Sequence, residues 1–431
     1  MLDINFIREN PQIVKDAAKN KNIKIDVDER LSLDESRRKI TTEIDELRAK
    51  RNTLSSEMKN QKPSPEQIEA GKKLKDEIAA LEQELQPVEE QWLSLMKAVP
   101  NIPASDVPIG GEENNKIIKT VGEPQKFSFK PKSDAELGLI NNIIDKERAA
   151  KVAGSRFAYI KGGLVLLQFA IINFVMDTLT DEPTIAKLIT ENGLKLKASP
   201  FIPILPPYLL KTGIYDRSAR LNREEVTYKL ADDDLWLQAS AEHPLCTMYA
   251  DETLKEEDLP IRYIGYATSF RREAGTYGKD MEGIFRMHQF DKLEMETFST
   301  ADTSYDEHLL MCAIQEHLVT KLDLPYQVVL KATGDVGKPN IRGVDIETWM
   351  PSQNAYRETH TADYMGDYQM RRLNTKVKFS DGQSSLAHTN DATAFALGRI
   401  MKAVIENNQN EDGSINIPEV LRPYMGGRDK V

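Results

Sequence analysis

Two runs of apolar residues with a heptad-like spacing limit how the first hundred residues can fold. Between residues 31 and 58 the seam positions step alternately by four and three, and six of the eight are apolar. A second run of the same kind covers residues 74–95. This spacing is typical of the buried seam of a coiled coil. Because a short segment with two prolines, residues 59–66, lies between the runs, the pattern predicts an antiparallel helical hairpin over about residues 31–98.

Two local features belong to the second helix of this hairpin. Ser64 is a candidate N-cap, Pro65 fits the first helical position, and Gln67 stands where a capping box places it. Pro87 lies inside the same helix, where a proline removes one hydrogen bond and clashes with the preceding turn. We therefore expect a kink or break at Pro87, near the base of the hairpin.

Charge is spread unevenly along the hairpin. Residues 48–75 hold eight lysines and arginines against three glutamates, whereas residues 76–98 hold six acidic residues and one lysine. A basic tip suits a polyanion, because neutralised phosphates dominate affinity for nucleic acids. A solvated face of a surface coiled coil would explain the same charges. The cations that could contact a nucleic acid are Arg48, Lys50, Arg51, Lys72, Lys73 and Lys75.

Composition excludes several broad classes of protein. The 431 residues carry a net charge of −11, so the chain does not coat nucleic acid or anionic membrane through its overall charge. Its two cysteines, Cys246 and Cys312, can build neither a disulfide framework nor a four-cysteine zinc site, and no structural zinc is expected. The most apolar segment, residues 163–179, contains Gln168 and Asn173 and predicts a core helix. With no apolar leader at the N-terminus, we expect a cytoplasmic protein.

The remainder of the chain predicts a domain of mixed α and β structure. We expect helices at 166–179, 306–322 and 394–406, and strands at 208–210, 235–238 and 262–270. Strands that cluster between helices, without regular alternation, favour an α+β fold with a mainly antiparallel sheet flanked by helices. The chain therefore divides into a helical arm at residues 1–105 and a second domain at residues 106–431.

The most informative functional side chains lie in residues 269–294. Arg271 and Glu273 alternate, and after a glycine-containing loop every second residue from Arg286 to Glu294 is Arg, His, Phe, Lys or Glu. A buried strand face this polar would be costly unless a ligand used it. Arginines suit phosphates, an aromatic ring suits a base, and a carboxylate suits an amine or hydroxyl, so the pattern indicates a nucleotide site. A solvated outer face with alternating charges is the alternative.

These residues resemble motif 2 of the class II aminoacyl-tRNA synthetases in the form found in the seryl-tRNA synthetase family of bacterial type. The form is Phe-Arg-x-Glu-Ala-Gly followed by His-Gln-Phe-x-Lys-x-Glu. The hairpin is similar to that family's tRNA-binding arm, and Pro206 and Pro207 match the motif 1 dimer interface. Further matches are Ala153 to Phe157, Gly398 and Arg399 of motif 3, and Pro418 to Tyr424. The resemblance covers the whole chain.

The resemblance implies a ligase of protein biosynthesis. Such an enzyme activates L-serine with ATP to give seryl-adenylate and pyrophosphate, and then transfers serine to the 3′ end of tRNA(Ser). It implies ATP and Mg²⁺ as cofactors and a homodimer formed through the catalytic domain, with no membrane partner. The attacking groups are the serine carboxylate and then the tRNA hydroxyl, so no side chain need act as a covalent nucleophile.

The family's roles carry over to matching residues. Arg271 would hold the α-phosphate, Phe290 would stack on adenine with Glu273 near its amino edge, and Arg399 would meet the far end of the triphosphate. Glu358 and Thr361 would ligate the metal, and Arg271, Glu358 and Arg399 form the implied catalytic set. The implied ATP site comprises Arg271, Arg272, Glu273, Arg286, Met287, His288, Gln289, Phe290, Glu358, Thr359, His360, Thr361 and Arg399. The implied serine site comprises Ser240, Ala241, Glu242, Arg271, Glu294, Asp391 and Thr393. For His288, a packed structural role is the alternative.

The chain departs from the family pattern around the amino-acid and metal sites. Ser240 stands where the family usually has threonine, and residues 391–393 read Asp-Ala-Thr instead of Asn-Gly-Ser. His360 and Thr361 replace a pair of serines, but hydroxyls persist at positions 240, 361 and 393.

Two other functions compete with the ligase. A ligase that loads carrier proteins would lack the arm and use cysteine-bound zinc. A catalytically silent RNA-binding paralogue would have lost Arg271, Glu273, Glu358 or Arg399, and all four are present.

Overall fold

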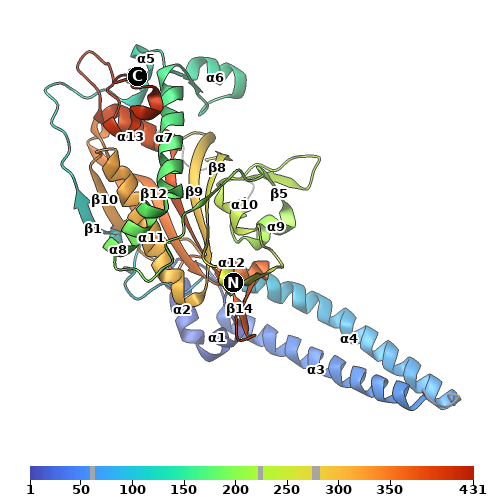
Figure 1. Ribbon diagram of the computed structural model, residues 1–431. Helices are drawn as coiled ribbons and strands as arrows, with labels where there is room; N and C mark the ends of the chain where they lie inside the picture. The colour runs from blue at the N-terminus through green and yellow to red at the C-terminus, as the bar shows by residue number, and fades with distance from the viewer. Residues whose placement is uncertain (59–63, 222–226, 274–281) are drawn as a thin grey trace. The chain divides into compact units, whose positions relative to one another are not determined.

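The computed structural model describes residues 1–58, 64–221, 227–273 and 282–431. The chain divides into two compact units, Met1–Ile102 and Pro103–Val431, which Figure 1 shows as a ribbon.

Helices make up the regular structure of the first unit, in the part that is described. They are α1 (Ile4–Glu9), α2 (Pro11–Asn20), α3 (Val27–Glu57) and α4 (Pro65–Ala98). The predicted hairpin is confirmed: α3 and α4 run side by side along their length (Figure 1). Their seam buries apolar side chains from both helices, namely Ile40, Ile44 and Ile78, with Leu47, Leu81, Leu85 and Val88 packed against them. A second small core, around Ile7, Val27 and Met96, joins α1 and α2 to the base of the hairpin.

The start of α4 follows the prediction, and of the kink or break expected at Pro87 the break does not occur. Ser64 Oγ accepts from the Gln67 amide at 3.2 Å, and Gln67 Oε1 accepts from the Ser64 amide at 3.0 Å, which completes the capping box. The expected break at Pro87 is wrong, because α4 continues to Ala98 with Pro87 inside it. Pro87 is exposed, and Leu85 and Val88 beside it keep their places in the seam. The carbonyl of Gln83 that loses its helical donor therefore lies on an exposed turn, where water can satisfy it.

An eight-stranded sheet forms the centre of the second unit. Every neighbouring pair is antiparallel except β4 and β8, which confirms the predicted α+β class. In spatial order the strands are β1 (Lys116–Val121), β10 (Tyr326–Leu330), β11 (Arg342–Met350), β12 (Ala355–Gly366), β15 (His388–Ala396), β9 (Gln289–Ser299), β8 (Ile261–Phe270) and β4 (Ile202–Ile204).

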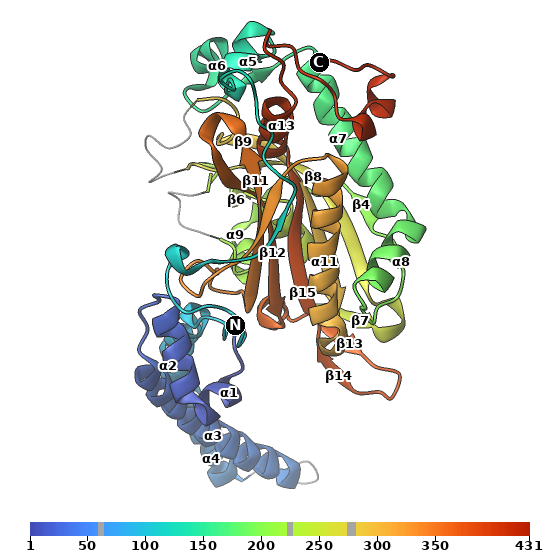
Figure 2. The ribbon, with the colours of Figure 1, turned by 90° about the vertical axis from the view of Figure 1, so that its left-hand side faces the viewer.

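Helices cover one face of this sheet. Figure 2 shows α11 (Ala301–Lys321) running along the strands, with α7 (Gly163–Thr180) and α8 (Glu182–Glu191) beside it. Because side chains alternate along a strand, Leu293 and Met295 of β9 join this core, whereas Lys292 and Glu294 face the other way. The helix α13 (Leu397–Asn407) packs against β9 and β11.

Smaller elements complete the second unit. The helices are α5 (Asp134–Ile140), α6 (Lys146–Ala153), α9 (Thr212–Arg217), α10 (Glu242–Cys246) and α12 (Tyr368–Leu373). The strands are β2 (Ile144–Asp145), β3 (Tyr159–Ile160), β5 (Leu209–Lys211), β6 (Leu235–Leu237), β7 (Thr253–Lys255), β13 (Lys376–Lys378) and β14 (Ser384–Leu386). Among the described residues, α7 alone is long and apolar enough to cross a membrane, and half of that helix is buried inside the protein.

Three predicted boundaries need correction. The helix expected from residue 306 begins five residues earlier, at Ala301. The helix expected over residues 394–406 begins only at Leu397, because residues 394–396 belong to β15, where Phe395 and Ala396 pair with β9. A short apolar run suits a buried strand as well as a helix, and the sheet decides between them. The strand expected from Arg286 begins at Gln289, so Arg286 and His288 lie in the preceding loop.

Candidate active site

A cavity of about 300 Å³ opens on the face of the sheet that α11 does not cover. Side chains of β9, β12 and β15 form one side of it. The start of α13, the α10 region, the segment after α9 and the segments on either side of residues 274–281 form the rest. Fourteen of the implied site residues line the cavity: Ser240, Glu242, Arg271, Glu273, Arg286, Met287, Phe290, Glu294, Glu358, Thr359, Thr361, Asp391, Thr393 and Arg399. Segments far apart in the sequence therefore meet here.

One part of the cavity combines cations with an aromatic ring. Arg271 directly follows β8, its Nε donates to the carbonyl oxygen of Ala239 at 3.0 Å, and its guanidinium carbon lies 5.3 Å from the centroid of the Phe290 ring. Burial, and repulsion from Arg399, lower the pKa of Arg271. An anion bound here would offset both effects, so the pair is suited to a phosphate beside a flat base.

Glu273 and Arg286 close the same part of the cavity from two loops. Arg286 Nη1 donates to Glu273 Oε2 at 2.7 Å. Further in, Arg399 lies 5.1 Å from the ring centroid of Phe285 and donates to Glu358 Oε1 at 2.7 Å. Desolvation opposes ionisation of Glu358, but attraction from Arg399 and Lys331 lowers its pKa to about 2. The Glu358 carboxylate is therefore ionised at neutral pH.

Oxygen atoms from β12 are the donors that the resemblance implies for a metal ion. Thr361 Oγ1 lies 3.4 Å from Glu358 Oε1, on the same strand. Within the described ranges, no group of three or more His, Cys, Asp or Glu could hold a metal. One carboxylate and one hydroxyl suit Mg²⁺, which keeps several waters and shares phosphate oxygens instead of requiring an all-protein cage.

The second part of the cavity is a network of buried polar side chains. Lys292 Nζ lies 2.5 Å from Glu294 Oε2 and donates to Ser240 Oγ at 3.4 Å. Thr393 Oγ1 donates to Glu294 Oε1 at 3.4 Å. Burial raises the pKa of Glu294, and Lys292 works against this shift. Ser240 and Thr393 thus reach the same carboxylate from opposite sides, Ser240 through Lys292 and Thr393 directly.

Sequence reasoning missed Arg220. Arg220 lies beyond α9 in a stretch without a recognisable motif, yet its side chain reaches the cavity and contacts Glu242, Asp363 and Asp391. These partners lie 22, 143 and 171 positions away in the sequence, so no local pattern could signal the contacts. Lys292 belongs to the alternating pattern of β9, but the resemblance assigns it no role in the site.

Five of the implied site residues do not line the cavity. Ala241 is fully buried in a small apolar cluster with Leu245 and Ala267. The guanidinium of Arg272 lies 4.7 Å from the centroid of the Tyr228 ring, and Gln289 is exposed at the start of β9. The other two are histidines.

His288 and His360 are held by the protein's own groups. His288 Nδ1 lies 2.8 Å from the carbonyl oxygen of Arg271, and the ring packs on Phe157. This geometry favours the structural role for His288. His360 is buried against Phe395, with Nδ1 2.8 Å from Thr359 Oγ1.

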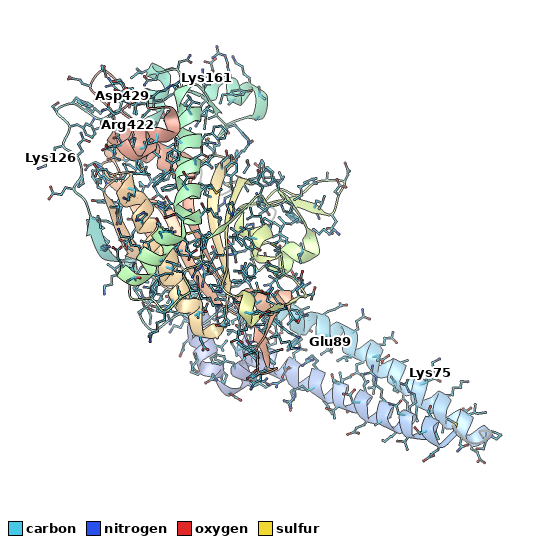
Figure 3. All side chains as sticks on the ribbon, in the orientation of Figure 1. Lys75, Glu89, Lys126, Lys161, Arg422 and Asp429 are labelled. Carbon is cyan, nitrogen blue, oxygen red and sulfur yellow. The ribbon has the colours of Figure 1, made fainter. Side chains whose placement is uncertain are left out.

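The candidate nucleic-acid contacts lie on the two long helices of the first unit. All six cations are exposed, as Figure 3 shows for Lys75. Arg48 is paired with Glu82 at 2.7 Å, and Lys73 lies 3.8 Å from Glu77. Exposed ion pairs of this kind are weak, so these side chains can reorient toward a stronger anion.

Comparison with known proteins gives matches over the whole chain. The model of the seryl-tRNA synthetase N-terminal domain matches residues 1–103, and that of the tRNA synthetase class II core domain (G, H, P, S and T) matches residues 226–408. A "Serine–tRNA ligase" of Symbiobacterium thermophilum is 39% identical, over 98% of each chain. That of Thermodesulfovibrio yellowstonii is 38% identical, over 99% of each chain.

Solved structures agree with these matches. The crystal structure of seryl-tRNA synthetase from Pyrococcus horikoshii complexed with ATP has a TM-score of 0.87 and 35% identity, and covers 100% of this chain and 99% of that one. The cytoplasmic serine–tRNA ligase from Naegleria fowleri in complex with AMP has a TM-score of 0.84 and 26% identity, and covers 100% and 98%.

Proposed function

This chain belongs to the seryl-tRNA synthetase family, and we propose that the cavity on its sheet is the site of that family's reaction. The protein is an ATP-dependent serine–tRNA ligase: it activates L-serine as seryl-adenylate, releases pyrophosphate, and transfers serine to the 3′ end of tRNA(Ser). One observation supports this assignment of the site above all others. The same cavity is lined by Arg271, Phe290, Glu358 and Arg399 and by the Lys292–Glu294 pair.

ATP lies in the part of the cavity that holds the arginines. Phe290 stacks on adenine, Arg271 contacts the α-phosphate, and Arg399 meets the terminal phosphates. As the serine carboxylate attacks the α-phosphorus and pyrophosphate leaves, negative charge builds on the oxygens beside Arg271. Because Arg271 is held by Ala239 before substrate binds, it stabilises this charge without reorganising. The seryl group then passes to the terminal hydroxyl of the tRNA, and AMP leaves.

Mg²⁺ fits this site as a partner of the phosphates. Glu358 and Thr361 would hold it, since they supply an ionised carboxylate and a hydroxyl at the edge of the arginine-rich part. When bound, the ion neutralises phosphate charge and supports the departure of pyrophosphate. Glu358 also accepts a hydrogen bond from Arg399, so the same carboxylate keeps Arg399 in position.

Serine lies in the second part of the cavity. Its ammonium group faces the carboxylates of Glu242 and Glu294, and its hydroxyl faces the Ser240 and Thr393 side. A small polar substrate suits this network, because an unpaired polar group in a buried site is costly. A site built to bond a hydroxyl also rejects analogues that lack one.

The helical arm binds tRNA and the catalytic domain forms a homodimer. The exposed cations of α3 and α4 support the first proposal. Large apolar side chains around the predicted motif 1 support the second: Leu205 is 75% exposed and Ile202 is 54% exposed, beside Pro206 and Pro207. Such exposure suits a surface that a second copy covers.

Leu205→Asp should shift the protein toward a monomer in sedimentation experiments, and an unchanged sedimentation coefficient would contradict a dimer through this surface.

ATP–pyrophosphate exchange tests the assignment of the cavity. We expect serine-dependent exchange by the purified protein without tRNA, and transfer of serine to a tRNA(Ser) transcript. Glu294→Gln should reduce exchange strongly, because it removes the carboxylate that joins Lys292 to Thr393. A silent paralogue or a carrier-protein ligase would fail the tRNA transfer. Neither alternative is favoured, since the chain keeps both the arm and the catalytic residues.

A further inference from the structure

Arg220 is the centre of a buried ionic cluster in the wall of the cavity. Its Nε donates to Glu242 Oε1, and its Nη2 lies 3.0 Å from Asp391 Oδ1 and 3.4 Å from Asp363 Oδ2. We call these four residues the Arg220 cluster. They come from the segment after α9, from α10, from β12 and from β15, so one guanidinium joins four separate segments.

The cluster brings three carboxyl groups to one cation. The side chains of Glu242, Asp363 and Asp391 are only 7%, 9% and 7% exposed. Across the described part of the chain, no lysine or arginine other than Arg220 forms an ion pair with any of the three. Buried carboxylates repel one another and are costly without a partner. Arg220 is therefore the cation paired with all three carboxylates of this wall.

A further carboxyl lies against this cluster. Glu296 of β9 lies directly opposite Asp391 in the register of β15, is fully buried, and has no hydrogen-bond partner on either oxygen among the described residues. Burial, together with nearby carboxylates, raises the pKa of Glu296 and of Asp391 well above their usual range. Without Arg220, this wall would lose the cation that keeps its carboxylates in a defined arrangement.

The Arg220 cluster borders the proposed serine subsite. Glu242 and Asp391 line the same cavity as Ser240, Glu294 and Thr393. Lys292 orders one side of that subsite through Glu294. Arg220 is a second cation in the wall of the same cavity, and its side chain, 16% exposed, fills part of that wall.

We propose that Arg220 is a positioning and specificity-determining residue of the serine subsite, an inference that rests on the proposed function. It holds the carboxylates of Glu242 and Asp391 in place for the ammonium and hydroxyl groups of the substrate, and it closes the subsite to amino acids larger than serine. Arg220 does not contact ATP in this assignment, so its effect belongs to the amino acid.

Kinetics of Arg220→Ala and Arg220→Lys test this role. We expect Arg220→Ala to raise the KM for serine about tenfold or more, because it removes a charge-assisted hydrogen bond, while the KM for ATP stays within about twofold. The ratio of kcat/KM for serine over threonine should fall about tenfold, because one methyl at a tight site changes discrimination by about 1–3 kcal/mol. Arg220→Lys keeps the positive charge but loses the planar guanidinium that bonds several carboxylates at once, so its serine KM and selectivity should lie between those of the wild type and Arg220→Ala.

Two further variants separate positioning from general destabilisation. Arg217→Ala is the matched control: Arg217 ends α9 and pairs with Asp251 at 2.7 Å, and it does not line the cavity. It should leave the KM for serine unchanged. Arg220→Ala with Asp391→Asn removes the repulsion between two carboxylates that Arg220→Ala leaves without a cation, and the new amide keeps an oxygen at position 391 for the substrate. Part of the lost serine affinity should therefore return, by about twofold or more relative to Arg220→Ala.

The stability and kinetic measurements together decide the outcome. Arg220 variants whose melting temperature falls while serine KM and selectivity stay at wild-type values would overturn the proposal, because Arg220 would then be structural only. If Arg220→Ala does not fold, an unchanged serine KM in Arg220→Lys and in the double variant has the same meaning. A wild-type protein without serine-dependent exchange would overturn the assignment of the cavity itself, and this inference with it.

Discussion

Arg271 is the residue on which the proposed activation chemistry most directly depends. We expect Arg271→Ala to lower kcat of serine-dependent exchange about a hundredfold or more, because a preorganised cation gains strength as charge builds in the transition state. Arg148→Ala is the control, since Arg148 pairs with Asp145 on the surface at α6. The measurement is pyrophosphate exchange at saturating serine and ATP. An unchanged rate in Arg271→Ala would remove this residue from the mechanism.

A second prediction at the scale of single residues concerns Ser240 and Thr393. Ser240 has one methyl fewer than threonine, and Thr393 one methyl more than serine. Both connect to Glu294, one through Lys292 and one directly, so the two positions share a network without touching. Ser240→Thr should raise the KM for serine, and Thr393→Ser should admit more threonine, because each shifts a tight pocket by one methyl.

The double variant tests whether the two substitutions compensate. We expect near-native selectivity and a coupling energy of about 0.5 kcal/mol or more, as is usual for residues of one network. Serine- and threonine-dependent exchange measures both quantities. Additive effects would show that the two positions act independently, and serine selection would then depend on other groups such as Arg220.

How far the sequence predicts the site depends on the distance between partners along the chain. Phe290, Lys292 and Glu294 alternate on one strand, so a short pattern is enough to place them on one face. Arg220 finds its partners on three other segments, and only tertiary packing brings them together. His360 shows the reverse: it follows a site residue in sequence, but the alternation of β12 turns it into the core against Phe395.

At the scale of elements, the heptad seams are sufficient to predict α3 and α4, because the two helices that pack together are close neighbours in the sequence. The start of α13 is not predictable in the same way. Phe395 and Ala396 are apolar and suit either structure, and their pairing with β9 decides in favour of a strand. Pro87 shows that packing can override local preference, since the seam on both sides holds α4 together.

Because α4 continues through Pro87, replacing this proline should make the arm more stable. Pro87→Ala restores a helical N–H donor and removes the clash with the preceding turn, so the free energy of unfolding of the arm should rise by about 1–3 kcal/mol. Thermal denaturation followed by circular dichroism measures the change. Glu89→Ala, at another exposed position of α4 (Figure 3), is the control and should change stability by less than about 0.5 kcal/mol. A loss of stability in Pro87→Ala would mean that the proline is needed for the course of the helix.

At the scale of the whole molecule, the arm and the catalytic unit have separate cores. The arm is held by its own seam and by the cluster around Ile7 and Met96, while every residue that lines the cavity belongs to Pro103–Val431. Adenylate formation needs only the cavity, so it should not depend on the arm.

Deleting residues 39–80 with a short closing turn should abolish tRNA charging. The rate of pyrophosphate exchange should stay within about a few-fold of the wild-type rate, since distant independent parts act additively. Charging that survives at wild-type tRNA concentrations would make the arm merely structural.

The cations of α4 allow a finer test of how the arm binds. If Lys72, Lys73 and Lys75 bind phosphates, replacing them with glutamine should weaken tRNA binding and flatten its dependence on salt, by about 0.7–0.9 in the log–log slope for each phosphate that is no longer neutralised. Glu84→Gln with Glu89→Gln is the matched control, because it also removes charges from exposed positions of α4 but takes away no cation. Titrations of labelled tRNA(Ser) at several salt concentrations give the slopes. An unchanged slope in the lysine variant would place the phosphate-binding residues elsewhere on the arm, with Arg48 and Arg51 of α3 the next to replace.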